Sequence, residues 1–436
     1  MIKIVKTALG FEREPLLLPF GFKGKYVNEI WNLSVAIQSG SGEKGIGLGV
    51  QSVLWSDSQV FSSFSPSGGN CIMLLMTEYA LSLLKDREFS DPIALLDEIF
   101  PQVYQYGQKI SGLNDMRKTF ALNALVPVDM ALWKLYVGEH KIKSFDDMLP
   151  PSANQALNNR QNLLASVPLI TYGIDTAAIT GLVENGSFIL KIKLGNDPDR
   201  DNDLEKMLAW DKERITQIHT ALKSSDTPYT ENGRIAYYLD ANGRYDCKDR
   251  LLRLIDHADK INALEQIVLF EEPFSEDIQV DVSDIPVRIA ADESVHSSQD
   301  ADRLIDMGYT AIALKPIAKT LSMSLKILEK AYKKNVPCFC ADLTVNPLMV
   351  EWNKNVAARL DTLPGIKTGV LEANGHQYYA NWENMKTYHP MGQSGWVDSR
   401  NGFFILDDNF YITNGGIFEN APHYENIAYG KNESNV

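Results

Sequence analysis

The chain has 436 residues, of which 44% are hydrophobic and 22% are charged, and its formal net charge is -14. This length leaves room for a large domain and a second, smaller one, and the composition is that of a globular protein able to bury a sizeable core. The acidic balance argues against a nucleic-acid partner, because phosphate neutralisation requires a basic surface.

Export and membrane signals are weak along the whole sequence. The first residues, MIKIVK, lack the apolar core and the cleavage site of a signal peptide. The apolar run 71–84 is shorter than a membrane span and contains Glu78. The cysteines are too few and too scattered for a disulfide framework, and two of them, Cys338 and Cys340, lie in an apolar run that predicts core packing rather than zinc binding. We expect a cytoplasmic protein with no membrane partner.

Residues 1–150 are predicted to form one α+β domain. Residues 29–38 and 44–50 flank a Ser-Gly turn and predict an antiparallel hairpin, with residues 2–5 as a third strand. The glycines of the second strand do not form a phosphate loop, since no strand-to-helix context follows them. Helical periodicity then predicts a helix over residues 114–135, in which Asp129 is expected to be a structural cap or a surface contact.

Two segments of this domain are predicted to be loops. Residues 56–70 are rich in serine, glycine and aromatic side chains, and residues 10–26 contain Arg13, Phe20 and Phe22. Long loops in compact enzymes often act as lids, although surface loops without a role are equally compatible with this composition.

Residues 235–316 carry three strand-like segments that end in a carboxylate and a fourth that ends in lysine. The segments end at Asp240, Glu271, Asp292 and Lys315. Their spacing allows a crossover helix after each strand, which predicts βα units around a parallel sheet. The C-terminal ends of such strands gather on one face, so we expect the three acids and the lysine to converge.

The other predicted strands complete an α/β fold, a (β/α)-barrel, over residues 151–375. In the second strand Lys191 and Lys193 share one face, because side chains alternate along a strand. Residues 376–436 are rich in aromatic side chains and are expected to pack back on the N-terminal domain. The additional strands are residues 167–173, 188–193, 336–340 and 369–372.

Five motifs in this order resemble the enolase superfamily, within its muconate-lactonizing-enzyme-like branch that includes dipeptide epimerases. They are Lys191-Ile-Lys193, Asp240-Ala-Asn242, Glu271-Glu272-Pro273, Ala291-Asp292-Glu293-Ser294 and Lys315-Pro316. The resemblance implies a modified TIM-like barrel of the enolase type with an N-terminal α+β capping domain. It also implies that both loop segments close the barrel mouth as lids, and that the protein is a symmetric homo-oligomer.

The three acids offer only oxygen ligands, which suits Mg²⁺ as the cofactor. The resemblance implies that Asp240, Glu271 and Asp292 bind the metal, with Glu271 preferred to Glu272. Two further side chains, Asn242 and Glu293, would support these ligands. Lysine or histidine bases with Mg²⁺ serve enolate chemistry in this superfamily.

Two lysines are candidates for the catalytic bases. Lys193 would remove the proton α to the carboxylate of a small-molecule substrate, with Lys191 as its electrostatic partner and a contact to that carboxylate. Lys315 would act from the opposite side of the barrel. Opposed bases fit a racemase or epimerase acting on a small carboxylate such as a dipeptide or an N-acyl amino acid. The same pair also serves β-elimination or cycloisomerisation, as in o-succinylbenzoate synthases or muconate-lactonizing enzymes, and a non-catalytic ligand-binding barrel is a further alternative.

The sequence departs from the related families at the eighth strand. Dipeptide epimerases place Asp-x-Asp there to hold the substrate ammonium, whereas this chain has Glu372-Ala-Asn374, which we take as the substrate-binding pair. The histidine–aspartate pair of mandelate racemases and sugar-acid dehydratases is missing near Cys340, which disfavours those activities. His296 is expected to begin a helix rather than to act in catalysis.

Overall fold

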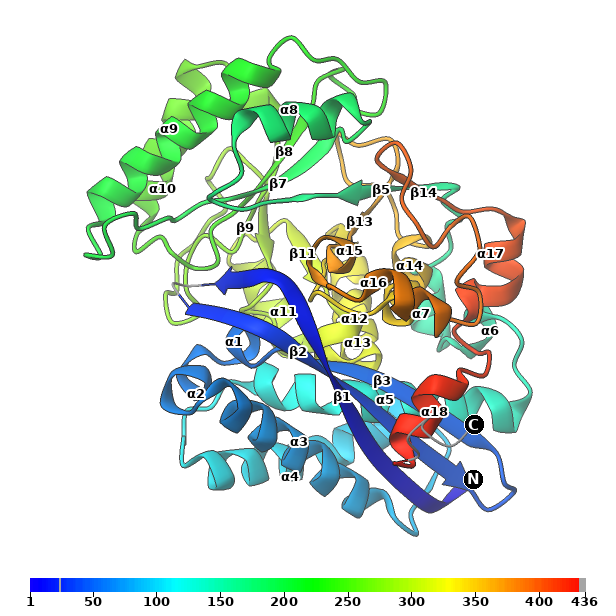
Figure 1. The fold of residues 1–436 in the computed structure, drawn as a ribbon. Coiled ribbons are helices and arrows are strands. Elements are labelled where there is room, and N and C mark those ends of the chain that lie inside the picture. The colour runs from blue at the N-terminus through cyan, green and yellow to red at the C-terminus, as the bar shows by residue number, and fades with distance from the viewer. Residues whose placement is uncertain (23–24, 431–436) are drawn as a thin grey trace.

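The computed structural model describes residues 1–22 and 25–430 and shows an N-terminal sheet with helices below a large barrel (Figure 1). The N-terminal sheet is antiparallel and has the order β3-β2-β1-β4. Its strands are β1 (Ile2–Phe22), β2 (Lys25–Ser39), β3 (Lys44–Gln51) and β4 (Glu88–Phe89).

The predicted loop over residues 10–26 is wrong for the part that the structure describes, because β1 and β2 form one long hairpin there. Phe11 faces Leu33 and Arg13 faces Trp31 in the ladder. The Phe11 ring also stacks on Trp31, with 4.5 Å between ring centroids. Cross-strand aromatic pairs of this kind stabilise a ladder, so these side chains support paired strands where a loop was predicted. Residues 23 and 24 lie outside the described residues.

The predicted loop over residues 56–70 is also wrong, since this segment is helical. Asp57 accepts hydrogen bonds from the backbone N–H groups of Gln59 and Val60, and Ser65 accepts one from Gly68. These contacts satisfy backbone donors that have no partner within a helix. The helices of this region are α1 (Val53–Ser56), α2 (Ser58–Ser63) and α3 (Pro66–Leu84).

A helical layer packs against this sheet, and α5 (Lys118–His140) is its central element. This helix is apolar and long enough to span a membrane by length and composition, which the sequence analysis overlooked, but 89% of its most hydrophobic window is buried inside the protein. It is therefore a core helix. Asp129 on α5 is fully buried and accepts a hydrogen bond of 3.0 Å from the backbone N–H of Ser322, which confirms it as a structural cap, here for α13 (Leu321–Lys333) of the barrel.

The contact between α5 and β3 predicts a large effect of a single methyl group. A Cβ at Gly47 would lie 1.9 Å from the carbonyl oxygen of Pro127. We expect Gly47→Ala to lower the free energy of unfolding by about 3 kcal/mol or more, because the backbones must separate. Gly181→Ala is the matched control, since nothing lies within 4 Å of its added Cβ and alanine favours a helix. Equal stability of the two variants in denaturant unfolding would contradict this packing.

The barrel contains eight parallel strand positions, and a segment interrupted at Pro168 closes the ring. The first half of this segment pairs with β13 and the second half with β7, so residues 163–170 join the two ends of the sheet. The strands are β5 (Leu163–Val167) with β6 (Leu169–Ile170), β7 (Ile189–Lys193), β8 (Ala236–Asp240), β9 (Ile267–Glu271), β10 (Ile289–Ala291), β11 (Ala311–Leu314), β12 (Cys338–Cys340) and β13 (Gly369–Glu372).

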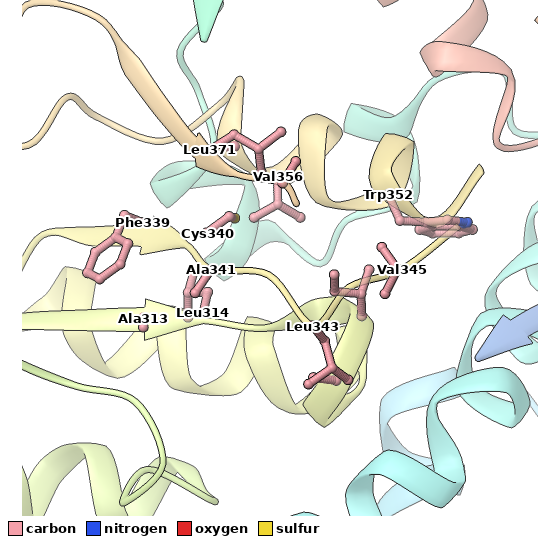
Figure 2. Packing of buried hydrophobic residues seen from close by; sticks show 14 of the residues in the cluster. Ala313, Leu314, Phe339, Cys340, Ala341, Leu343, Val345, Trp352, Val356 and Leu371 are labelled. Atoms are coloured by element: carbon pink, nitrogen blue, oxygen red, sulfur yellow. The ribbon is translucent and has the colours of Figure 1, made fainter. Parts of the chain in front are cut away.

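Helices follow most barrel strands and cover their outer face (Figure 1). Figure 2 shows the buried apolar side chains near β12, among them Cys340, its ladder partner Leu371 on β13, and Val356 of α14. Both strand cysteines are buried and free of disulfides, which confirms their prediction as core residues. These helices include α8 (Thr176–Glu184), α9 (Leu204–Leu222), α10 (Lys248–Lys260), α11 (Ser298–Asp306), α12 (Pro316–Lys319), α13 and α14 (Pro347–Ala357).

The C-terminal segment contacts both parts of the chain. Its strand β14 (Phe403–Ile405) pairs antiparallel with β5, whereas its last helix, α18 (Pro422–Ala428), packs on β1 and β2. The Ser34 hydroxyl on β2 donates to the carbonyl oxygen of Tyr424 at 2.7 Å. The C-terminal segment thus ties the N-terminal domain to the barrel.

Candidate active site

A pocket lies where the C-terminal ends of the barrel strands meet the N-terminal domain. In barrel enzymes this end of the strands is the usual place of the active site. Val27, Glu29 and the segment 51–55 line it from the N-terminal domain. Nine of the residues singled out in the sequence line it from the barrel: Lys191, Lys193, Asp240, Asn242, Glu271, Asp292, Lys315, Glu372 and Asn374.

Strand register brings Lys193 next to the first acid. In the parallel ladder Lys193 faces Asp240, and Asp240 faces Glu271 on the next strand. The Lys193 ammonium lies 2.6 Å from Asp240 Oδ2 and 2.6 Å from Asn242 Oδ1. Its side chain is 15% exposed, compared with 3% for Lys191. Both lysines line the pocket, and Lys193 is the more exposed of the two.

Lys191 forms the centre of a buried ionic network. Its Nζ lies 3.0 Å from Asp240 Oδ2, 3.0 Å from Glu271 Oε1 and 3.0 Å from Glu372 Oε2. Burial opposes its charge, but these carboxylates together raise the Lys191 pKa well above its usual value. These contacts favour the charged form of Lys191, which suits an electrostatic contact to a substrate carboxylate.

A second network surrounds Asp292 on the far side of the pocket. Lys315 Nζ lies 2.6 Å from Asp292 Oδ2 and 4.4 Å from the centroid of the Trp55 ring. Lys319 Nζ lies 3.4 Å from Asp292 Oδ1 and also donates to the carbonyl oxygens of Asp292 and Val295. Although burial opposes ionisation of Asp292, the two ammonium groups lower its pKa. Sequence analysis missed Lys319, which follows Lys315 by one helical turn across Pro316.

The acidic residues at the strand ends fit a hard divalent cation. Oxygens of Glu271, Asp292 and Glu293 lie within 4.8 Å of one another. Glu293 Oε2 is buried and has no hydrogen-bond partner among the described residues, while its Oε1 accepts from Asn242 at 2.8 Å. The Glu272 carboxylate is already hydrogen-bonded, because it accepts from the backbone N–H of Asp292. An oxygen-only donor set with a spare buried oxygen fits Mg²⁺.

This grouping differs in one respect from the predicted ligand set. Asp240 lies outside the cluster of three and is held by Lys191 and Lys193, whereas Glu293, expected only to support the ligands, lies inside it. Burial, reinforced by Asp292, raises the pKa of Glu271 to about 7, although Lys191 opposes the shift. Crowded buried carboxylates with raised pKa values gain most from a bound cation. The role of Asp240 as a ligand stays a prediction.

The eighth-strand pair lies in the pocket but is already hydrogen-bonded. Glu372 Oε2 contacts Lys191 and accepts from the backbone N–H of Asp342 at 3.3 Å. Asn374 Oδ1 accepts from the Thr344 hydroxyl at 2.7 Å. A substrate group that binds Glu372 or Asn374 would therefore share these side chains with their present hydrogen-bond partners.

His296 precedes helix α11, as expected, and it joins the two domains. Its Nε2 lies 2.5 Å from Glu276 Oε2, and its Nδ1 lies 2.9 Å from the Thr119 hydroxyl on α5. Arg117 of the N-terminal domain also binds Glu276 and donates to the carbonyl oxygen of Glu293 at 3.1 Å. This contact fixes the loop that carries Asp292 and Glu293 against the N-terminal domain.

Sequence analysis missed further pocket residues, including Asp342, Gln51 and Trp55. Asp342 lies two residues beyond β12, so the pattern of strands that end in a carboxylate could have identified it. Gln51 and Trp55 come from the N-terminal domain and reach the pocket only through tertiary packing. Nothing in their local sequence indicates this position.

Comparisons with known proteins agree with this architecture. Residues 176–367 match the family model described as "Enolase C-terminal domain-like". No curated protein has significant similarity to the chain. A mandelate racemase/muconate lactonizing protein from Herpetosiphon aurantiacus shares the fold, with a TM-score of 0.64 and 17% identity over 93% of this chain and 96% of that chain.

Two epimerases of known structure are also similar in fold. The L-Ala-D/L-Glu epimerase from Bacillus subtilis has a TM-score of 0.62 and 20% identity, over 87% of this chain and 92% of that chain. A dipeptide epimerase from Enterococcus faecalis V583, complexed with Mg and the dipeptide L-Leu-L-Tyr, has a TM-score of 0.60 and 18% identity over the same shares. The resemblance to the enolase superfamily is thereby confirmed, as is the barrel with an N-terminal capping domain.

Proposed function

We propose that this protein removes the proton α to the carboxylate of a small substrate and acts as a racemase or epimerase, on a dipeptide or an N-acyl amino acid. The observation that carries the proposal is the opposition of Lys193 and Lys315 across one pocket. Their strands, β7 and β11, stand four positions apart in a ring of eight. Side chains that enter from opposite sides of a barrel can reach opposite faces of a planar enolate.

Each lysine would move one proton at the α-carbon. The neutral amine of one lysine takes the proton from one face, and the ammonium of the other returns a proton to the opposite face, which inverts the centre. Lys191, whose charged form the surrounding carboxylates favour, would contact the substrate carboxylate. Glu271, Asp292 and Glu293, with Asp240, would hold Mg²⁺, which would stabilise the negative charge that develops on the carboxylate.

The structural relatives support this proposal. Two of the similar structures are described as epimerases, and one of them is complexed with Mg and a dipeptide. The oxygen-only cluster of the present chain fits the same metal.

Deuterium exchange at the α-carbon tests the proposed reaction. Pools of dipeptides, N-acyl amino acids and succinylbenzoate-type acids are incubated with the protein and Mg²⁺ in D₂O and followed by NMR. We expect label in both stereoisomers of a substrate. An alkene product would instead identify an eliminase, a lactone a cycloisomerase, and no exchange in any pool would favour a ligand-binding barrel.

A further inference from the structure

Asp342 is a buried carboxylate in the pocket that the proposed proton transfer does not use. It lies just beyond β12 and is 6% exposed. Its Oδ1 accepts from the backbone N–H of Leu343 at 2.7 Å, and its Oδ2 accepts from that of Asn374 at 2.5 Å. No lysine, arginine or histidine within residues 1–22 and 25–430 forms an ion pair with it.

The other carboxylates that line the pocket each have a cationic partner. Lys191 forms ion pairs with Glu271 and Glu372, and Arg13 forms one with Glu29. Lysines also pair with the acids at the ends of β8 and beyond β10. Asp342 is the exception among the lining residues that the structure describes, and a buried carboxylate normally requires such a partner.

The surroundings of Asp342 favour an incoming cation. Burial and the neighbouring charge of Glu372 on β13 raise the pKa of Asp342 to about 7, although the backbone hydrogen bonds from Asn374 and Leu343 and the charge of Lys315 oppose the shift. Tyr379, after α15 (Gly375–Tyr378), also responds to this carboxylate, because burial and the neighbouring Asp342 both raise the Tyr379 pKa. A cation placed at Asp342 would relieve the repulsion between two carboxylates.

Gln51 supplies an independent sign of a polar ligand. This residue lines the same pocket and is 5% exposed, yet neither its amide nitrogen nor its amide oxygen has a hydrogen-bond partner among the described residues. The indole N–H of Trp55, four residues later, is in the same situation. A buried amide with a free donor and a free acceptor is matched by a ligand that offers an acceptor and a donor, as a peptide group does.

We propose that Asp342 binds the ammonium group of the substrate and that the Gln51 side chain hydrogen-bonds with the peptide group of the substrate. The substrate is then a small peptide with a free amino group rather than an N-acylated amino acid. This assignment rests on the proposed function, since it concerns the far end of the molecule whose carboxylate meets the lysines.

A dipeptide and its N-acetyl derivative provide the test, because they differ only in the positive charge. With Mg²⁺ present, binding is measured by calorimetry and turnover by α-deuterium exchange. We expect the wild type to bind the free dipeptide at least about tenfold more tightly. Asp342→Asn should remove this preference and leave the affinity for the acetylated compound within about twofold. Asp408→Asn, at a side chain that is 96% exposed, is the control and should keep the preference.

The wild-type pH dependence tests the same contact without a substitution. Asp342 becomes charged as the pH rises through about 7, and a peptide amino group loses its charge near pH 8. Affinity for the free dipeptide should therefore rise on the acid side and fall on the alkaline side. The acetylated compound should lack this maximum, and Asp342→Asn should lose its acid side.

Three results would overturn the assignment. They are a wild-type preference for the acetylated dipeptide, an equal weakening of both ligands by Asp342→Asn, and no binding of either dipeptide. In the last case lysine-dependent exchange of another carboxylate would show that the proposed function stands while the ammonium contact fails. Absence of exchange with every carboxylate would count against the proposed function itself.

Discussion

Replacing Lys193 or Lys315 by alanine is expected to lower the rate of epimerisation by about 10²–10⁴-fold, the usual contribution of a general acid or base. The two variants should differ in which stereoisomer they still label. In the proposed mechanism each lysine faces one side of the α-carbon, so the remaining lysine can exchange only the proton that points toward it. NMR in D₂O with each pure stereoisomer measures this split.

Controls separate loss of a base from damage to the site. Lys333→Ala removes a lysine whose side chain is 63% exposed and should behave as wild type. Mg²⁺ should still raise the melting temperature of Lys193→Ala, because that residue is outside the cluster of Glu271, Asp292 and Glu293. If either alanine variant labelled both stereoisomers at the wild-type rate, the two-base arrangement would be wrong.

The barrel and its polar centre could be predicted because their signal is local. A short apolar run ends at each of four polar residues, Asp240, Glu271, Asp292 and Lys315. Parallel strands place their C-terminal ends on one face of the barrel, and this holds irrespective of the sequence of the connecting helices. The same reasoning extends to Asp342, which was missed only because a short loop separates it from β12.

The remaining features depend on tertiary packing. Residues 56–70 have the composition of a loop, yet they are helical. The side chains of Asp57 and Ser65 accept hydrogen bonds from backbone N–H groups in the first turns of the helices, and Phe61 is buried, so tertiary packing overrides local composition here. Gln51 and Trp55 enter the pocket because the N-terminal domain sits on the barrel mouth. No periodicity in their own segment carries this information.

Asp292 is expected to link the stability of the barrel to the proposed metal site. Lys315 and Lys319 are 4% and 1% exposed, and both lie beside this carboxylate. Asp292→Asn would leave two buried ammonium groups without their shared counter-charge. We expect a loss of about 3–5 kcal/mol in the free energy of unfolding, the usual cost of breaking a buried ion pair. Denaturant unfolding without added metal measures it.

The same variant should lose its response to the metal. At a hundredfold excess over its dissociation constant, Mg²⁺ should stabilise the wild type by about 2.7 kcal/mol, and Asp292→Asn by far less. Asp129→Asn is the matched control, because it alters a buried carboxylate bound to Ser322 and remote from the cluster. It should lower stability while keeping the full Mg²⁺ response. A wild-type response retained in Asp292→Asn would remove this residue from the metal site and leave it as a counter-charge for the two lysines.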